Sequence, residues 1–526
     1  MIKRVIGVLV LSIFIIFFSI FTATFSHSQQ GEKTLSLSLD DCIMRALKNN
    51  LGVAIDVLTP QLSEVSVSLA KEKFLPQFSA SFSDSSEISA SYSWTDAEES
   101  VFQKNMNYRF QVSQLIPTGG NITAYIYNYT NDTNRSLQTI NPRYGSTLRF
   151  NFTQPLIRNF GPKMARREII IAQNNSDISD NNFKSSLQNT IYDVEEAYWN
   201  LVYTIELLKV RQQSLKLAQD LLEKNKKSVE VGSLAPIEIL NAQSTVATRE
   251  ADILQQEALV KNAEDLLKSI INLPSDEAKS AQIIPSDTPT YEKVEVELEQ
   301  ALVTAMQNRP DLEATRLDIK NKEINLSYTR NQLLPDLSLT ASYWSPGLSG
   351  TQIKYLNDRP QDGIIIETIP GKVTDAIKDA FNFKYKNWSV GLTLDIPLDS
   401  LISRASYAQA RINMEQALLR MKNQEQEIYL DIKTAVRAVE TNYKRVQAYK
   451  VARELQQKKL EAEEEKLRVG LTTNYFVLQF QRDLVDSQVS ELKAIIDYNL
   501  SLARLNRSLG VTLKEKNITI PEFFGR

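Results

Sequence analysis

The chain contains two copies of one long unit, and this duplication constrains the fold more than any other feature. Leu75-Pro76-Gln77-Phe78 recurs as Leu334-Pro335-Asp336-Leu337, so the two prolines stand 259 positions apart. The same offset aligns Leu39 with Leu298, Ala46 with Ala305, Leu47 with Met306 and Asn49 with Asn308. A duplication of this size indicates a repeat architecture. We expect the first repeat over residues 29–294, the second over 295–512 and a C-terminal tail over 513–526.

The composition argues against most kinds of enzyme. The only histidine is His27, which lies in the N-terminal leader, so a mature chain has no imidazole for proton transfer or metal binding. The single cysteine, Cys42, allows no internal disulfide. Lys and Arg (60) nearly balance Asp and Glu (63), which gives no bias toward nucleic acid. Because no P-loop or dinucleotide-binding pattern occurs either, we expect no catalytic, cofactor or metal site.

The N-terminus has the pattern of a secretory signal peptide over residues 1–28. Lys3 and Arg4 precede an apolar run from Val5 to about Phe21, and Ser26-His27-Ser28 offers a cleavage site with small flanking residues. The alternative is an uncleaved membrane anchor. No later apolar run resembles a membrane-spanning helix, and the mean hydropathy of −0.27 fits a largely water-exposed chain.

Helical periodicity dominates the rest of the chain. We expect two long helices over 162–230 and 403–468, and shorter ones over about 39–73, 235–271, 296–333 and 474–508. Within the second long helix, apolar residues recur in steps of four and three, as in a coiled coil, at Ile428, Ile432, Ala435, Val439, Tyr443 and Val446. At 1.5 Å per residue the long helices span roughly 100 Å and the short ones about 55 Å. Two short helices end to end therefore match one long helix, which predicts a cylinder of constant height.

Between the helices the period of the pattern changes to two, which predicts strands. Apolar and polar residues alternate over 77–83, 108–113, 148–153, 336–343 and 388–396, and the run 121–130 carries Tyr125, Tyr127 and Tyr129 on one face. Such strands suit a half-buried antiparallel sheet or a membrane barrel. The barrel is favoured, because the helix seams already face one another and lipid would cover the apolar strand face. Several copies of the chain would be needed to close it.

Prolines mark the ends of the two strand regions. Pro76 and Pro335 end a helix and begin a strand, because the residue before proline favours extended backbone. Pro155 and Pro397 end the strand regions, which we place at 76–156 and 335–397. The first region is the longer, and we expect its excess near 121–143 as an extra hairpin or a long loop. The first repeat can therefore supply two or four strands.

The duplicated unit, the paired Leu-Pro junctions, Gln154-Pro155-Leu156 and the paired Val-Gly turns resemble the TolC family of outer-membrane factors. This resemblance covers nearly the whole chain after the leader. It implies a mainly α fold with membrane β: a homotrimer with a shared 12-stranded transmembrane β-barrel, continued by a long coiled-coil helical tunnel in the periplasm. It also implies an exit duct of a tripartite efflux pump or a type I secretion system. The implied partners are a periplasmic adaptor protein, an inner-membrane pump of RND or ABC type, and outer-membrane lipid.

Two turns at the ends of long helices are the candidate docking sites. Glycine after a helix permits the left-handed conformation with which the chain reverses, and this predicts hairpin tips near 232 and 470. The resemblance implies that the tips meet the adaptor. They comprise Val231, Gly232, Ser233, Leu234 and Ala235 in the first repeat and Val469, Gly470, Leu471 and Thr472 in the second.

Four residues just beyond the tips are candidates for a periplasmic gate. The resemblance places a constriction there, at Glu238 and Asn241 in the first repeat and Phe476 and Gln479 in the second. Glu238 is equally suited to a first helical turn, where the helix dipole favours an acid. The second repeat has no acid at the matching positions.

Two other hypotheses compete with the channel. One is a coiled-coil scaffold of the cell envelope, anchored by an uncleaved N-terminal helix. The other is a periplasmic hydrolase that uses a pair of carboxylates, although no pair stands out. The sequence does not identify the cargo, the cognate pump or the resting state of the mouth.

Overall fold

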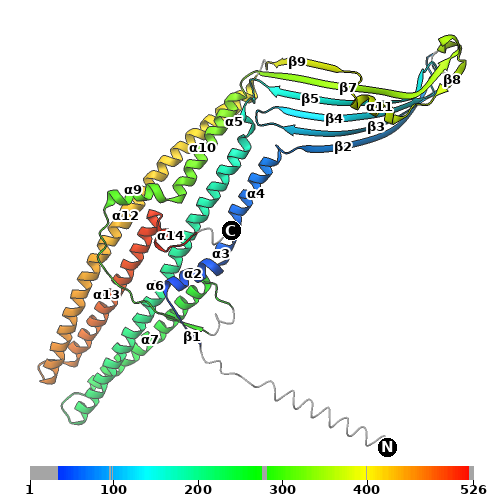
Figure 1. Cartoon of the computed structure of the whole chain (residues 1–526). Coiled ribbons are helices and arrows are strands. Elements are labelled where there is room, and N and C mark those ends of the chain that lie inside the picture. Colours follow the sequence, from blue (N-terminus) through cyan, green and yellow to red (C-terminus); the bar gives the residue numbers. More distant parts are fainter. Residues whose placement is uncertain (1–32, 94–95, 97–98, 275–280, 398–399, 520–526) are drawn as a thin grey trace, which may run out of the picture. The chain divides into compact units, whose positions relative to one another are not determined.

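The computed structural model describes residues 33–519 except 94–95, 97–98, 275–280 and 398–399 (Figure 1). The predicted signal peptide therefore lies outside the described residues. No described helix is both long enough and apolar enough to cross a membrane. The chain forms two compact units: unit 1 takes in residues up to 57, 184–309 and from 428 on, and unit 2 takes in 58–183 and 310–427. Each unit therefore draws on both halves of the sequence.

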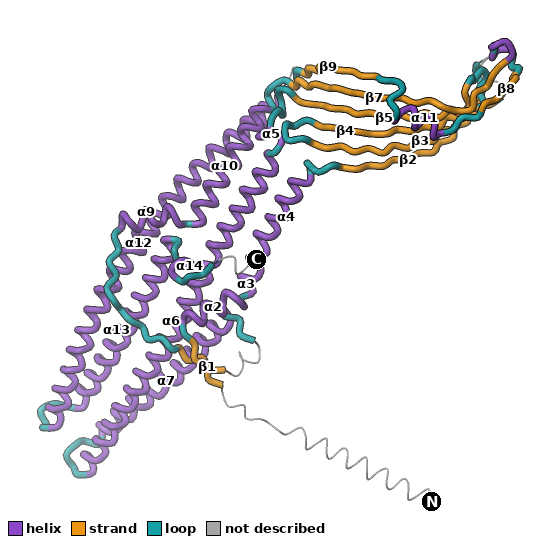
Figure 2. Tube along the Cα trace, in the orientation of Figure 1, coloured by secondary structure: helices purple, strands orange, loops and turns teal. Residues whose placement is uncertain are grey.

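Unit 2 contains an antiparallel sheet of six long strands and one short strand (Figure 2). The long strands are β2 (Gln77–Ala90), β3 (Ser100–Leu115), β4 (Asn121–Thr133), β5 (Ile140–Pro155), β7 (Asp336–Tyr355) and β9 (Asn387–Asp395). They lie in the order β2-β3-β4-β5-β7-β9, and the short β8 (Ile365–Ile369) pairs with the far end of β7. Every neighbouring pair is antiparallel, so the strands alternate strictly in direction.

The first repeat supplies four of the six long strands, which decides between the two and four left open by the sequence. A 12-stranded barrel shared by three chains would take four strands from each, so this chain has two more. The additional hairpin is β3–β4. β2 corresponds to β7, which begins 259 positions later, and β5 corresponds to β9, because each is the last strand before the long helix of its repeat. The excess thus begins at Ser100, earlier than the expected 121–143.

Gln154 holds the turn between β3 and β4. Its side-chain oxygen accepts a hydrogen bond of 2.6 Å from the Thr118 hydroxyl, and its amide donates to the Thr118 carbonyl at 3.1 Å. Gln154 is almost fully buried and Gly120 lies directly against it. The Gln-Pro-Leu motif therefore has a local structural role, which is to fix the extra hairpin at the end of the sheet where β2 begins.

The strand register sorts the side chains onto two consistent faces. In the paired rows Phe110 is opposite Ala80 and Ile126, and Leu392 is opposite Leu339. Following this register, the apolar face carries Phe78, Phe82, Tyr108, Phe110, Val112, Ile122, Ile126, Leu148, Phe150, Phe152, Leu339, Tyr343, Trp388, Val390, Leu392 and Leu394. The predicted alternation is thus confirmed. The three tyrosines of β4 lie on the opposite, polar face, because Ile122, Ala124 and Ile126 occupy the apolar one.

A short helix, α11 (Val373–Phe381), packs on the apolar face of β5 and β7. Ala376 and Ala380 are buried, and a Cβ at Gly347 would overlap the Ala376 carbonyl, so the helix backbone lies directly on the strand. Tyr343 and Phe383 extend this contact with ring centroids 5.6 Å apart. In the first repeat the hairpin β3–β4 lies between β2 and β5 along the chain. The corresponding segment of the second repeat, between β7 and β9, contains the 3₁₀ turns η1 (Leu356–Asp358) and η2 (Pro360–Asp362), then β8 and α11.

Helices make up most of the remainder of both units. Unit 2 also contains α4 (Leu58–Glu72), α5 (Pro162–Ala165) and α10 (Pro310–Asn331), and the long helices α6 (Arg167–Glu230) and α12 (Leu401–Arg468) run through both units. Unit 1 contains α2 (Leu39–Asn49), α3 (Leu51–Asp56), α7 (Ile237–Ile270), α9 (Leu298–Asn308), α13 (Asn474–Leu509), α14 (Thr512–Glu515) and a parallel strand pair, β1 (Lys33–Leu37) with β6 (Ala281–Pro285).

Two of the predicted helices are broken. The segment 39–73 forms three helices. The first break is at Asn50, whose side chain caps α3 by accepting hydrogen bonds from the amides of Gly52 and Val53, and the second break is at Val57. The segment 296–333 breaks at Arg309, whose extended backbone is what a following Pro310 requires. Both long helices and the helices that return from them agree with the prediction to within a few residues.

The apolar seam predicted on α12 is buried. Ile428, Ile432, Ala435, Val439 and Val446 are all at most 2% exposed, and the last three pack with Ala494, Tyr498 and Leu505 of α13. Tyr443 is partly buried beside them. A buried valine or isoleucine side chain of this kind contributes about 1.5–3 kcal/mol, so the seam stabilises the packing of the two helices.

Candidate functional site at the hairpin tips

Both helical hairpins of unit 1 turn through the same motif. After α6 the Ser233 amide donates to the Ser228 carbonyl and the Gly232 amide donates to the Val229 carbonyl, both at 2.9 Å. After α12 the Leu471 amide donates to Lys466 at 2.9 Å and the Gly470 amide to Leu467 at 3.0 Å. These are the two hydrogen bonds of a Schellman motif, in which the residue after the helix is left-handed. Gly232 and Gly470 have φ values of 76° and 75°, as the sequence predicts for reversing glycines.

The second tip has an additional internal bond. The Thr472 hydroxyl donates to the Glu463 carboxylate, which also forms an ion pair of 3.2 Å with Lys466. The hydrogen bond from Thr472, followed by the charge of Lys466, lowers the pKa of Glu463 below its ordinary value. Thr472 therefore ties the turn back onto α12, and this hydrogen bond is strongest while Glu463 is ionised.

This bond makes the second tip sensitive to acid. Because the pKa of Glu463 is lower in the folded chain than in an unfolded one, its stabilising effect is complete above the ordinary pKa and disappears as the pH falls through the lowered value. Thr472→Ala is expected to remove most of that dependence. Hydrogen exchange of residues 463–475 from neutral pH down to about pH 3 measures it, and equal acid-induced opening in both proteins would contradict the assignment.

Apolar side chains are exposed around both tips. The Val231 side chain is 79% exposed and that of Leu471 is 78% exposed. Ile237 and Leu240 are exposed beside the first tip, and Tyr475 and Phe476 beside the second. Beneath them the buried cluster of Leu221, Leu460, Val477 and Leu484 joins α6, α12 and α13. The tips are thus apolar surfaces on a packed support, which is typical of protein contact sites.

The four candidate gate residues stand in the first turns of α7 and α13. Glu238 is half-buried, and its backbone carbonyl accepts a hydrogen bond of 3.4 Å from Asn225. Asn241 and Gln479 are exposed, and Phe476 packs edge-on against Tyr475 at 5.5 Å. In the described part of the chain no hydrogen bond or ion pair joins the α7 residues to the α13 residues. Within a single chain, Glu238 and Asn241 are therefore neighbours on α7, and Phe476 and Gln479 are neighbours on α13, but among the described residues no such bond joins one pair to the other.

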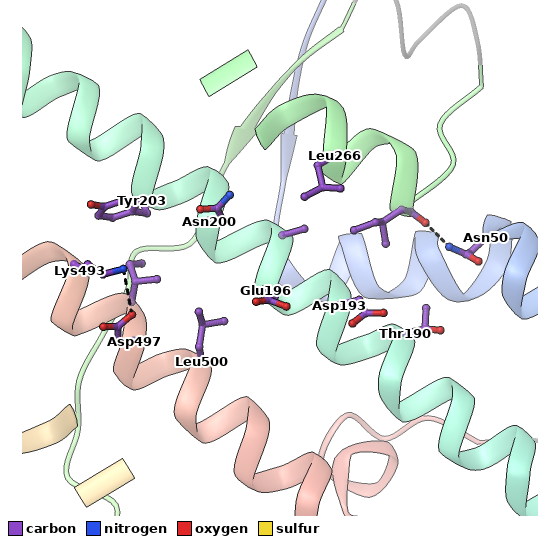
Figure 3. Close-up of a pocket in the computed structure, with 13 residues that line it drawn as sticks. Asn50, Thr190, Asp193, Glu196, Asn200, Tyr203, Leu266, Lys493, Asp497 and Leu500 are labelled. Carbon is purple, nitrogen blue, oxygen red and sulfur yellow. Dashed lines mark hydrogen bonds and ion pairs between the residues drawn. The ribbon is translucent and has the colours of Figure 1, made fainter. Parts of the chain in front are cut away.

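A groove in unit 1, which sequence reasoning missed, is lined by α6, the end of α7 and α13 (Figure 3). It encloses about 700 Å³. Asp193 and Glu196 come from α6, and Lys493 and Asp497, 3.8 Å apart, come from α13. Desolvation raises the pKa of Asp193. The sequence gives one signal for this groove: Asp193 and Glu196 are three positions apart, and Lys493 and Asp497 are four apart. Such spacings also occur on any solvated helix face.

Burial makes the one cysteine an unsuitable nucleophile. Cys42 is fully buried, and desolvation raises the pKa of its thiol to about 12. A thiol of that kind stays protonated near neutral pH and is unreactive.

Comparison with known proteins agrees with this geometry. Residues 127–273 and 301–511 match the family model for outer membrane efflux proteins. The chain is 20% identical over 505 residues to the outer membrane efflux protein BepC of Brucella suis, covering 94% of this chain and 90% of that protein. It is 21% identical to nodulation protein T of Rhizobium leguminosarum, but spans only 62% of that relative's length. The solved CmeC outer membrane channel of Campylobacter jejuni has a TM-score of 0.62 at 14% identity, covering 94% of this chain and 95% of that one.

The fold is that of an outer-membrane channel, with long helices joined to a β domain. The chain belongs to the outer membrane efflux protein family, whose model matches well over half of its length. This family consists of channel proteins and not of enzymes. The expected resemblance, the mainly α fold with a β domain and the role of an exit duct in the outer membrane are confirmed, and the scaffold and hydrolase hypotheses are set aside.

Proposed function

We propose that three copies of the chain form one continuous duct that conducts solutes passively from the periplasm to the exterior. In this proposal the apolar face of the sheet contacts lipid, the polar face lines the channel, and the helices continue the channel into the periplasm. The observation that carries the proposal is the apolar face, which crosses all six long strands toward the end of the sheet where β2 begins. The charged residues of this face, Asp84, Lys104 and Asp132, lie further toward the other end. Each of these strands has at least the nine residues that a tilted membrane-spanning strand needs.

The two edge strands support closure by identical copies. β2 and β9 each pair on one side only, and nearly all of their residues are exposed. Unpaired strand edges are not tolerated in lipid, so each edge needs a partner strand. Because β2 and β9 run in opposite directions, β9 of one copy pairs antiparallel with β2 of the next. Three copies of six strands then close a ring of 18 strands in place of 12, a size at which barrels enclose an aqueous channel.

The exposed tips support a role in assembly with a pump. Their apolar residues suit the helical hairpins of a periplasmic adaptor, which would connect the duct to an inner-membrane pump of RND or ABC type. Relatives named for efflux favour a tripartite efflux pump over secretion. Glu238, Asn241, Phe476 and Gln479 stand one turn beyond the tips, where a ring of three copies could narrow the mouth.

A planar bilayer tests the proposal most directly. Purified protein is expected to produce stepwise conductance, and native mass spectrometry in detergent is expected to give the mass of three chains. A water-soluble monomer without conductance would contradict the duct and would revive the envelope scaffold. An assembly of four copies would refute the trimer and leave the duct intact.

Substitution of Gly470 tests the docking role of the tips. A β-branched residue at φ 75° is strained by roughly 1–2 kcal/mol, so Gly470→Val is expected to distort the second tip and weaken adaptor binding about tenfold. No neighbouring atom lies within 4 Å of the new Cβ, so insertion and conductance should persist. Gly470→Asn is the matched control, because asparagine tolerates the left-handed region. Unchanged adaptor affinity for Gly470→Val, measured by surface plasmon resonance, would rule out the docking role.

A further inference from the structure

We infer that the polar face of the sheet carries an anion-selective filter for aromatic or other planar organic anions. The filter consists of arginines held against aromatic rings on four neighbouring strands, and we call it the arginine ladder: Arg109, Tyr125, Tyr127, Tyr129, Arg143, Arg149 and Trp344. This inference rests on the proposed function, because it requires that the polar face lines the channel.

The ladder follows from the strand register. Arg109 on β3 is opposite Tyr127 on β4, and Tyr125 on β4 is opposite Arg149 on β5, which in turn is opposite Trp344 on β7. The Arg109 guanidinium lies 4.9 Å from the Tyr125 ring centroid and 5.2 Å from that of Tyr127. The Arg149 guanidinium lies 4.8 Å from the Trp344 centroid. Cations and rings therefore alternate across the strands on one face.

The third arginine extends the ladder along the strands. The Arg143 guanidinium lies 5.5 Å from the Tyr129 ring centroid. Gly145 stands beneath the Tyr129 ring, where any side chain would collide with it, so the ring can lie flat against the sheet. Arginines thus occur at two levels of the channel wall.

Neutral partners hold these side chains in place. Arg149 donates to the Asn151 side chain at 2.8 Å and to the Ser342 hydroxyl at 3.2 Å. The Tyr127 hydroxyl donates to Asn107 at 2.8 Å. Rings and amides orient the guanidinium groups without cancelling their charge. Each group keeps free N–H donors that can bind a carboxylate, sulfonate or phosphate in a bidentate manner.

The charge of the ladder is not compensated locally. Among the residues that the structure describes, Arg109, Arg143 and Arg149 form no ion pair with a carboxylate. On the six long strands the polar-face carboxylates lie near the strand ends, at Glu87, Asp336 and Asp395, and Asp336 is already paired with Arg158. The middle of this face is therefore net positive. Arginine rings of this kind select anions in pores, and the exposed aromatic faces add affinity for planar solutes.

The reversal potential of the reconstituted channel in a KCl gradient tests the filter. Wild-type protein is expected to be more permeable to chloride than to potassium, and naphthalene sulfonate is expected to block chloride current. The double variant Arg109→Gln/Arg149→Gln should lower the chloride-to-potassium permeability ratio at least fivefold, because about fivefold is the factor for a single unit charge near 4 Å in water and the variant removes two charges from each chain. Arg109→Lys/Arg149→Lys should keep the chloride preference, because the positive charges remain. This variant should lose much of the sulfonate block, because lysine stacks poorly on aromatic rings and does not bind a sulfonate in a bidentate manner.

The control and the contrary outcomes separate this inference from the proposed function. Lys104→Gln changes a charge on the opposite face, where Lys104 lies 4.0 Å from Asp84, and should leave selectivity unchanged. A wild-type channel that conducts without preferring chloride would refute the filter and leave the duct standing. A wild-type protein that forms no channel would refute the duct itself. The wild-type measurement alone can refute either the filter or the duct, even if the glutamine variants assemble poorly.

Discussion

Val390→Arg is expected to abolish assembly of the channel in the membrane. Val390 is 63% exposed and lies on the apolar face of β9, between Trp388 and Leu392. An arginine facing lipid near the middle of a membrane strand costs about 2–4 kcal/mol, and a ring of three copies suffers that cost three times. The measurement is the fraction of protein recovered as an oligomer from outer membranes, on a gel run without heating. Nearly all of the oligomer should be lost.

Ser389→Arg is the matched control. Ser389 precedes Val390 on the same strand and lies on the polar face, where an arginine would meet water. The oligomer should form at close to the wild-type level. If Val390→Arg assembled as well as Ser389→Arg, the apolar face would not contact lipid and the barrel would be disproved.

Gly347→Ala is expected to detach α11 from the sheet. The added methyl would overlap the backbone carbonyl of Ala376, and a backbone atom inside a helix cannot swing away as a flexible side chain can. Overpacking of this kind costs typically about 1–3 kcal/mol, and detachment also exposes Ala376 and Ala380 and breaks the contact between Tyr343 and Phe383. The expected readouts are a lower melting temperature of the assembly and rapid proteolysis between 370 and 386.

Gly391→Ala provides the comparison for this change. Gly391 is also a strand glycine of the sheet, but its added methyl would meet only the Thr340 hydroxyl, at 3.3 Å. Its melting temperature and its resistance to protease should stay close to those of the wild-type protein. Equal stability of the two variants would mean that α11 does not rest on Gly347.

Features that depend on local pattern could be predicted from the sequence. The seam from Ile428 to Val446 follows from helical spacing, and the reversal at Gly232 and Gly470 follows from the conformation that only glycine adopts easily. The alternation of β9 followed equally well, because one face of that strand is entirely apolar.

Features that depend on pairing between distant segments could not be predicted. The sequence left the first repeat with two or four strands, because β4 has tyrosines on one face and isoleucines on the other, so neither face is clearly polar. The arginine ladder arises only when Arg109, Tyr125 and Arg149 are placed in register from three strands. The break at Asn50 was missed because the residues around it fit a continuous helix. The Asn50 side chain accepts hydrogen bonds from backbone amides that would otherwise bond within that helix.

The hairpin β3–β4 shows how such a duct can change its calibre. It turns at the end of the sheet where β2 begins and adds two strands per chain, while the corresponding part of the second repeat holds α11 and β8. Inserting or deleting one hairpin keeps the number of strands per chain even. The two edge strands then still run in opposite directions, so neighbouring copies can still pair antiparallel. In the proposed trimer, a hairpin gained or lost in the sheet would change the width of the barrel and leave the turns at Gly232 and Gly470 unchanged, so the width of the exit and the choice of partner could vary independently.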